Sequence, residues 1–327
     1  MSALPLVWVV GSGGLLGASV WRELGADAWR PARTLSWGDP TRLEREFQDA
    51  VAEFGLHVRA RPGRTWAVAW CAGAGVVGTS AAALERETRT FERFLALVAS
   101  DPNLSALPGA FSLASSAGGV YAGSTVSPIT EATEPAPISA YGHAKLAQER
   151  MLAAWVAEHV HVRALKARFS NLYGPGQQLA KAQGLISHTS RCVIYGAPVQ
   201  IYVSLDTIRD YLFADDAARA LVAGLHRLAL SSDLQLVTKV YASEREVSIA
   251  GLLGVFRQIA RRRLRVVAGL HATTSLQPRR LQFRSQVWNH TGRQVELIEG
   301  VSRVYQHQLG LFGRGLLPPP PPLASRR

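Results

Sequence analysis

Three consecutive patterns near the start of the chain constrain the fold more than any other feature of the sequence. Residues 5–10 form an apolar run that ends at the glycine-rich segment Gly11–Gly17. Leu16, Val20 and Leu24 then recur at intervals of four, which places them on one face of a helix. A strand, a glycine turn and a helix in this order open a βαβ unit. The order predicts a parallel α/β sheet.

The same alternation continues along the chain. Apolar runs predict further strands, and amphipathic spacing predicts helices between them. Such alternation is typical of a doubly wound parallel sheet of the Rossmann type, with helices on both faces. The expected strands are 28–33, 66–70, 109–116 and 162–169, and the expected helices are 41–54, 84–98, 141–159 and 215–228, the last capped by Asp215 or Asp216.

The alternation of strands and helices stops after residue 171, where a segment rich in Gly, Pro and Gln predicts a loop over 171–182. Farther on, helices and short strands mix without clean alternation, which predicts a smaller C-terminal α/β domain. Five consecutive prolines near the end predict an extended, solvated segment. We expect a larger domain from 1–171 plus about 206–240, a smaller domain from 172–205 plus 241–315, and a disordered Pro-rich tail from 316–327.

Composition excludes several classes of protein. With 327 residues, 47% of them apolar and only 18% charged, the chain can bury a sizeable core. No apolar run reaches the roughly 18 residues of a membrane helix, and the opening segment lacks the basic flank and cleavage site of a signal peptide. Two cysteines exclude a disulfide scaffold and a cysteine zinc site, and they favour a reducing cytoplasm.

The formal net charge of +12 raises the question of an anionic partner. Only four of the 36 basic residues are lysine, however, and the arginines are scattered along the chain. We therefore attribute the charge to an arginine-rich composition and expect no nucleic-acid partner. A nucleic-acid binder would show steep salt dependence and no effect of Tyr141→Phe.

The glycine turn carries the first chemical signal. Gly11, Gly14 and Gly17 have GxxGxxG spacing between a strand and a helix. Glycine allows a tight turn and close approach of the backbone to a pyrophosphate, and the helix N-terminus supplies free N–H groups. This context predicts dinucleotide binding.

A tyrosine and a lysine carry the second signal. Tyr141 and Lys145 lie at i and i+4 on an expected helix, so they share a face. A lysine ammonium there stabilises a tyrosinate, which suits Tyr141 to general acid/base work. Ser115 and Ser116 end an expected strand, at the sheet edge where α/β proteins bind ligands. Each pattern also has a chance explanation, as helical spacing or as a small-residue turn.

Together these segments resemble the extended short-chain dehydrogenase/reductase family, the NAD-dependent epimerase/dehydratases, whose members mostly act on nucleotide sugars. The segment Pro137–Ala140 before Tyr141 also matches the family. So do Arg168–Gln177 and Arg209–Asp216, the latter as an RDY…DD segment. The resemblance covers residue 5 to about residue 230 with its motifs in order.

The resemblance implies a role for each matching residue. The catalytic residues are Tyr141 as acid/base, Lys145 as its electrostatic partner and Ser116 as the hydroxyl that orients the substrate. Ser116, Asn171 and Arg209 contact the substrate, the last two at its diphosphate. The expected cofactor contacts are Gly11, Ser12, Gly13, Gly14, Leu15, Gly17, Arg30, Arg33, Asp39, Ala72, Gly73, Ser115, Tyr141 and Lys145. The resemblance also makes the larger expected domain the dinucleotide-binding domain and the smaller one the substrate domain. A homodimer is usual in the family.

Three departures refine the expectation. Ala117, Gly118 and Gly119 follow Ser116 where dehydratases of the family carry Asp-Glu, which disfavours a 4,6-dehydratase. No acid follows Asp27 to grip the ribose, so Arg30 or Arg33 slightly favours NADP over NAD, with solvated surface arginines as the alternative. Gly38-Asp39, which resembles the family's adenine contact, comes unusually early, and Asp39 is equally suited to cap the next helix.

We therefore expect an NAD(P)-dependent oxidoreductase that acts on a nucleotide sugar as an epimerase or a 4-ketoreductase. The alternative is a redox-inactive regulator of the same fold, against which the intact Ser116, Tyr141 and Lys145 argue.

Overall fold

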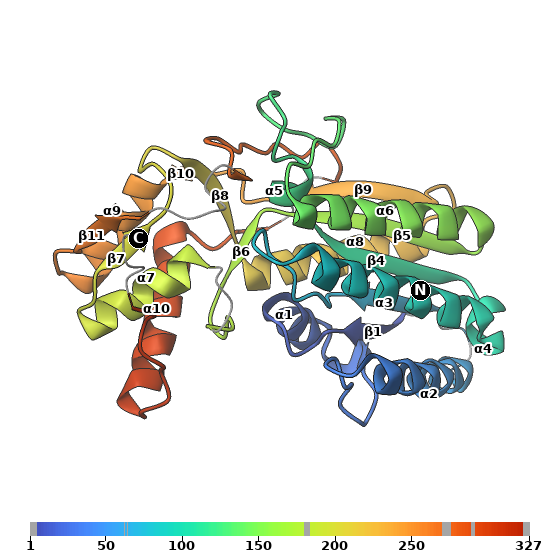
Figure 1. Cartoon of the computed structure of the whole chain (residues 1–327). Helices are drawn as coiled ribbons and strands as arrows, with labels where there is room; N and C mark the ends of the chain where they lie inside the picture. The colour runs from blue at the N-terminus through green and yellow to red at the C-terminus, as the bar shows by residue number, and fades with distance from the viewer. Residues whose placement is uncertain are drawn as a thin grey trace.

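A six-stranded sheet forms the centre of the larger part of the molecule (Figure 1). The computed structural model describes residues 5–61, 63, 65–179, 184–269, 276–288 and 292–322. All neighbouring strands of the sheet are parallel, in the order β2-β1-β3-β4-β5-β9. This confirms the predicted doubly wound fold. The strands are β1 Leu6–Val10, β2 Ala28–Trp29, β3 Trp66–Trp70, β4 Gly109–Ser116, β5 Val162–Phe169 and β9 Leu236–Tyr241.

Helices bury both faces of this sheet. Side chains alternate along β1, so Trp8 packs into one core cluster while Val7 and Val9 pack into the other. The Trp8 face is covered by α2 Pro40–Arg59, α3 Ala81–Ser100 and α6 Ala140–Glu158, and the Val7 face by α1 Leu15–Leu24 and α8 Ala214–Leu230. The continuous apolar runs in the sequence reflect this two-sided burial.

Smaller sheets and three helices form a second group of elements, beside the first (Figure 1). Antiparallel β10 and parallel β6 flank β8 in a three-stranded sheet, and β7 pairs with β11. Two further core clusters lie among these elements. Their bounds are β6 Asn171–Tyr173, α7 Leu185–Tyr195, β7 Val199–Ile201, β8 Ile208–Phe213, β10 Glu246–Ser248, α9 Ile249–Ala260, β11 Val266–Ala268 and α10 Leu297–Gly313.

The described residues also include three short helical segments. They are η1 Gly25–Asp27, α4 Pro102–Ser105 and α5 Ala117–Val120, which follows β4 directly. None of the helices in the described ranges is long and apolar enough to cross a membrane.

Some local expectations need correction. The strand expected over 28–33 pairs only at Ala28 and Trp29, and Pro31 follows, which lacks the N–H that pairing requires. The loop expected from residue 171 begins instead with β6, because Asn171–Tyr173 pairs with β8. Neither aspartate caps α8. Phe213 is its N-cap, while both acids lie in the first turn, where they still favour the helix dipole.

The residue just before the five prolines packs against the rest of the protein. Leu317 is buried, and its carbonyl accepts a hydrogen bond of 2.5 Å from the Tyr195 hydroxyl. Residues 318–322 have no regular secondary structure. The last five residues of the expected tail, 323–327, lie outside the described residues.

Candidate functional site

The turn after β1 is built so that only glycine fits at two of its positions. Gly11 has φ +85°, and a Cβ there would lie 2.6 Å from the Ala72 nitrogen. A Cβ on Gly17 would lie 2.2 Å from the Gly11 carbonyl oxygen. The Gly14 N–H donates to that same carbonyl at 3.0 Å, which closes the turn.

The start of α1 satisfies the requirements for an anion site. Gly14 is its N-cap and offers no side chain to the first N–H groups, and no acid lies in the first turn. A Cβ on Gly13 would meet no described atom within 4 Å, so the backbone there faces open space. Free N–H donors, the positive end of the helix dipole and a bare backbone fit the pyrophosphate of a dinucleotide.

The segment after β2 holds the residues expected to distinguish the two cofactors. Arg30 and Arg33 are both exposed, and the Arg30 guanidinium lies 4.7 Å from the centre of the Trp21 ring. Asp39 is the N-cap of α2 and accepts the Arg42 N–H at 3.0 Å. The capping alternative for Asp39 is therefore confirmed.

The catalytic candidates meet where β4 ends and α6 begins. Ser116 caps α5 by accepting the Gly119 N–H at 3.0 Å. A Cβ on Gly119 would lie 3.3 Å from the Ser116 hydroxyl oxygen and 3.0 Å from Cε1 of Tyr141. The serine hydroxyl and the tyrosine ring thus converge on this glycine, from two different elements. The structure thus brings together two of the three residues that the sequence analysis singled out as catalytic.

Lys145 lies one helical turn after Tyr141 on α6 and is almost fully buried. Its ammonium donates to Oε1 of Gln148 at 3.1 Å and to Oε1 of Glu87 at 3.3 Å. Glu87 belongs to α3 and was not singled out from the sequence. Its place three residues after the buried Leu84, on the same helix face, is the signal that points to it.

Glu87 also holds the loop after β3. Its Oε2 accepts the N–H of Ala74 at 2.9 Å and that of Gly75 at 3.1 Å. This loop includes the expected cofactor contacts Ala72 and Gly73. A Cβ on Gly73 would lie 2.9 Å from Oε1 of Glu87 and 3.4 Å from the Lys145 nitrogen. The loop therefore passes directly over the ion pair.

The structure gives the two serines at the end of β4 different surroundings. Ser115 is buried and donates to Oε1 of Glu149 at 2.6 Å, below the sheet edge. Arg168 binds the same carboxylate and also contacts the Tyr121 hydroxyl. Ser116, in contrast, lies beside Tyr141. Of the two, Ser116 is the one whose surroundings suit a substrate contact.

The two residues expected at the substrate diphosphate lie on paired strands of the small sheet. The Asn171 amide on β6 donates to the Asp210 carbonyl at 2.9 Å. The neighbouring Arg209, on β8, is 8% exposed and donates to the Ile208 carbonyl at 2.8 Å and to Gln277 at 3.4 Å. Burial lowers the pKa of this guanidinium. Within the described part of the chain it has no carboxylate in ion-pair range.

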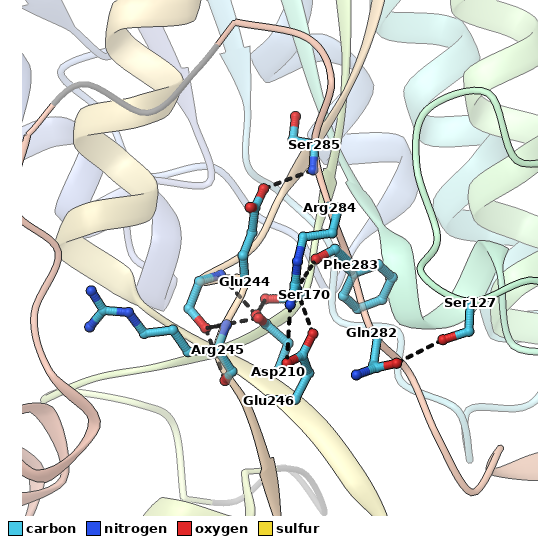
Figure 2. Close-up of polar contacts among 11 residues, drawn as sticks. Ser127, Ser170, Asp210, Glu244, Arg245, Glu246, Gln282, Phe283, Arg284 and Ser285 are labelled. Atoms are coloured by element: carbon cyan, nitrogen blue, oxygen red, sulfur yellow. Dashed lines mark hydrogen bonds and ion pairs between the residues drawn. The ribbon is translucent and has the colours of Figure 1, made fainter.

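The acids near Arg209 are bound elsewhere. Asp206 pairs with Arg279 rather than with Arg209. Asp210 is fully buried and accepts from the Ser170 hydroxyl at 2.5 Å and from Ser243 at 2.8 and 2.9 Å (Figure 2). Burial raises the pKa of this carboxyl. A buried arginine whose neighbouring acids are occupied is suited to bind an anion from outside the chain.

The segment 282–285 lies near Asp210 and Glu246 (Figure 2). Arg284 forms an ion pair of 2.5 Å with Glu246, and Ser127 donates to Gln282 at 2.8 Å. Across the described ranges, no group of three or more His, Cys, Asp or Glu side chains could hold a metal ion.

A parallel sheet covered on both faces, with a glycine turn leading into α1, defines a Rossmann-type α/β protein. A family model described as the NAD dependent epimerase/dehydratase family matches residues 7–233, and the chain belongs to this family.

Curated relatives and a solved structure agree with this assignment. The chain is 40% identical over 97 residues, 29% of its length, to a dTDP-L-rhamnose 4-epimerase of Burkholderia thailandensis. It is 31% identical over 112 residues, 34% of its length, to a dTDP-4-dehydro-6-deoxyglucose reductase of Escherichia coli. These matches span only 26% and 35% of the two relatives. A structure of MoeE5 in complex with UDP-glucose and NAD superposes with a TM-score of 0.73 at 22% identity, covering 94% of this chain and 99% of that one.

Proposed function

We propose that the protein is an NAD(P)-dependent oxidoreductase that acts on a nucleotide sugar, as an epimerase or a 4-ketoreductase. The observation that carries the proposal is the convergence of the Ser116 hydroxyl and the Tyr141 ring on Gly119, with Lys145 one turn along the same helix. A serine hydroxyl and a tyrosine ring at one glycine, with a buried lysine one turn along the helix, are suited to proton transfer to and from an alcohol or a carbonyl.

The proposed chemistry divides between the cofactor and the chain. A bound nicotinamide supplies or accepts hydride at the sugar carbon. Tyr141 gives or takes the hydroxyl proton of the same carbon. Ser116 orients that oxygen by a hydrogen bond, and Lys145 stabilises negative charge on the tyrosine oxygen. The glycine turn and the start of α1 hold the pyrophosphate.

The substrate diphosphate is assigned to Asn171 and Arg209. Support comes from the burial of Arg209 without a described carboxylate partner, because a buried cation of this kind gains most from a charged ligand. The nucleotide sugars in the names of the similar proteins, with dTDP and UDP groups, are consistent with this assignment.

One feature of the sequence favours epimerisation or ketoreduction over dehydration. The residues after Ser116 are Ala117, Gly118 and Gly119, which provide no acid pair to remove water. Arg30 and Arg33 are the proposed contacts for the 2′-phosphate of NADP, with NAD as the alternative.

One experiment tests which dinucleotide the protein binds and distinguishes an epimerase from a ketoreductase. The purified protein is denatured, any released dinucleotide is identified by mass, and the emptied protein is titrated with NADH and NADPH. Stoichiometric retained NAD supports an epimerase, which regenerates its cofactor in each turnover, and contradicts the proposed role of the two arginines. An empty protein that prefers NADPH supports a ketoreductase. A protein that binds neither contradicts the proposed function.

A further inference from the structure

Glu87 is the only acidic side chain of the described residues that contacts both the loop after β3 and Lys145. It extends from α3, and its side chain is 17% exposed. Because the loop and Lys145 come from separate elements, one carboxylate ties together three parts of the chain: α3, the loop and α6.

The two carboxylate oxygens have different tasks. Oε2 accepts two backbone N–H groups, at 2.9 and 3.1 Å, and thereby fixes the path of Ala74 and Gly75. Oε1 accepts from the Lys145 ammonium at 3.3 Å. The loop has little room to move, since a Cβ on Gly75 would lie 2.6 Å from Leu84 and 3.4 Å from the Tyr141 ring.

The lysine ammonium is oriented as well as neutralised. Glu87 and Gln148 take two of its N–H groups. Within the described part of the chain, this leaves the third N–H for a ligand. An ammonium held by two fixed acceptors presents its remaining donor in one direction, which lowers the cost of binding a hydroxyl there.

We propose that Glu87 is a positioning residue for the nicotinamide-ribose end of the cofactor site, acting through Lys145 and through the backbone of Ala74 and Gly75. The proposal rests on the function proposed above and on the cofactor contact that the family resemblance implies for Lys145, which we take to be with the nicotinamide ribose. It assigns no contact between Glu87 and the cofactor itself. It also assigns no role to Glu87 at the adenosine end, where the glycine turn holds the pyrophosphate.

Truncated cofactors test this division without a sugar substrate. ADP contains the adenosine and the pyrophosphate, ADP-ribose adds the second ribose, and NADH adds the nicotinamide. The 2′-phosphorylated forms replace them if the wild-type protein prefers NADPH. Dissociation constants are measured by calorimetry for the full chain.

Three variants separate the tasks of the carboxylate. Glu87→Gln keeps an amide oxygen for the two backbone N–H groups but removes the negative charge beside Lys145. Glu87→Ala removes both contacts. The matched control is Glu85→Gln on the same helix, whose side chain is 66% exposed and pairs with Arg89. Thermal unfolding of each variant checks that the fold is retained, and Glu87→Gln alone decides if Glu87→Ala does not fold.

We expect the dissociation constants of ADP-ribose and NADH to rise about threefold in Glu87→Gln and about thirtyfold in Glu87→Ala. The affinity for ADP stays within about twofold of the wild type in both, and Glu85→Gln matches the wild type throughout. In a Lys145→Met background, Glu87→Gln produces no further change, because the ion pair is already absent.

Three results overturn the proposal: Glu87 variants that bind ADP-ribose as tightly as Glu85→Gln, equal losses for ADP and ADP-ribose, or a Glu87→Gln effect that persists without Lys145. In each case the wild-type protein still binds the dinucleotide, so the proposed function stands. Wild-type protein that binds none of the probes overturns the proposed function and this inference together.

Discussion

Arg168 and Glu149 form a buried ion pair beneath the candidate active site, with Nη2 of the arginine 2.6 Å from Oε2 of the glutamate. Their side chains are 5% and 1% exposed. Ser115 donates to the same carboxylate. The pair thereby links the ends of β4 and β5 to α6, the three elements that support Ser116 and Tyr141.

Breaking this pair is expected to destabilise the fold. Glu149→Gln leaves the Arg168 guanidinium buried without a counter-ion, which costs about 3–5 kcal/mol in the free energy of unfolding. Urea unfolding followed by circular dichroism measures the change. The control is Glu299→Gln, which breaks the exposed Arg303 pair on α10 and costs less than about 0.5 kcal/mol. Equal losses of stability in the two variants would show that burial of the Arg168–Glu149 pair does not increase its contribution to the free energy of unfolding.

Tyr141→Phe removes the hydroxyl proposed to carry the proton and leaves the ring in place. We expect turnover of a confirmed nucleotide-sugar substrate to fall by a factor of about 10²–10⁴. Dinucleotide affinity stays within a few-fold of the wild type. Steady-state kinetics and a binding titration measure the two quantities. Near wild-type turnover would contradict the catalytic role of Tyr141.

Gly119→Ala places a methyl group between the proposed catalytic residues. The new Cβ lies 3.0 Å from Cε1 of Tyr141 and 3.3 Å from the Ser116 hydroxyl, so the ring has to move. Because a shift of a few tenths of an ångström weakens the alignment for proton transfer, we expect about a tenfold loss of turnover. Gly118→Ala is the control, since its Cβ meets only Leu281, at an ordinary 3.8 Å. Unchanged turnover in Gly119→Ala would show that the ring position is not critical.

Substitutions at Gly17, in α1, and at Gly13, in the turn before it, are expected to affect stability and dinucleotide binding separately. Gly17→Ala forces a Cβ against the Gly11 carbonyl and lowers the free energy of unfolding by about 1–3 kcal/mol. Gly13→Ala faces open space, so it leaves stability unchanged but obstructs the approach of a pyrophosphate. Thermal unfolding and NADH or NADPH titration measure the two effects. Undiminished dinucleotide affinity in Gly13→Ala would place the pyrophosphate elsewhere.

His188 is expected to make stability depend on mildly acidic pH. Burial, with a smaller contribution from Arg191, lowers the pKa of its imidazole below the usual value of 6.5. As the pH falls through 6.5, the unfolded chain therefore takes up the proton before the folded one, and stability is lost until the pH reaches the folded-state pKa. Urea unfolding at pH 7.5 and pH 5.5 measures the drop, which is expected to be smaller in His188→Asn. An equal drop in both proteins would exclude this contribution.

Much of the larger sheet is predictable from local pattern. The bounds of β3, β4 and β5 agree with the apolar runs 66–70, 109–116 and 162–169, because strands buried on both faces need continuous apolar sequence between turn residues. Pairing of β2 and β6 depends on neighbouring strands, so the strand over 28–33 was predicted too long and β6 was predicted as a loop. The same holds for the start of α8, where Asp215 binds Ser19 and Arg22 instead of capping the helix.

The candidate site also combines features that local sequence predicts with features that it does not. The helical spacing of Tyr141 and Lys145 and the glycine turn before α1 are local patterns, so the sequence by itself determined them. Which serine lies beside Tyr141, whether Arg209 has a counter-ion, and the contact between Glu87 and Lys145 were decided only by the tertiary structure. Each of these depends on side chains brought together from separate elements. Hydrogen bonds and ion pairs act over a few ångströms, and only the packed sheet brings those elements within that range.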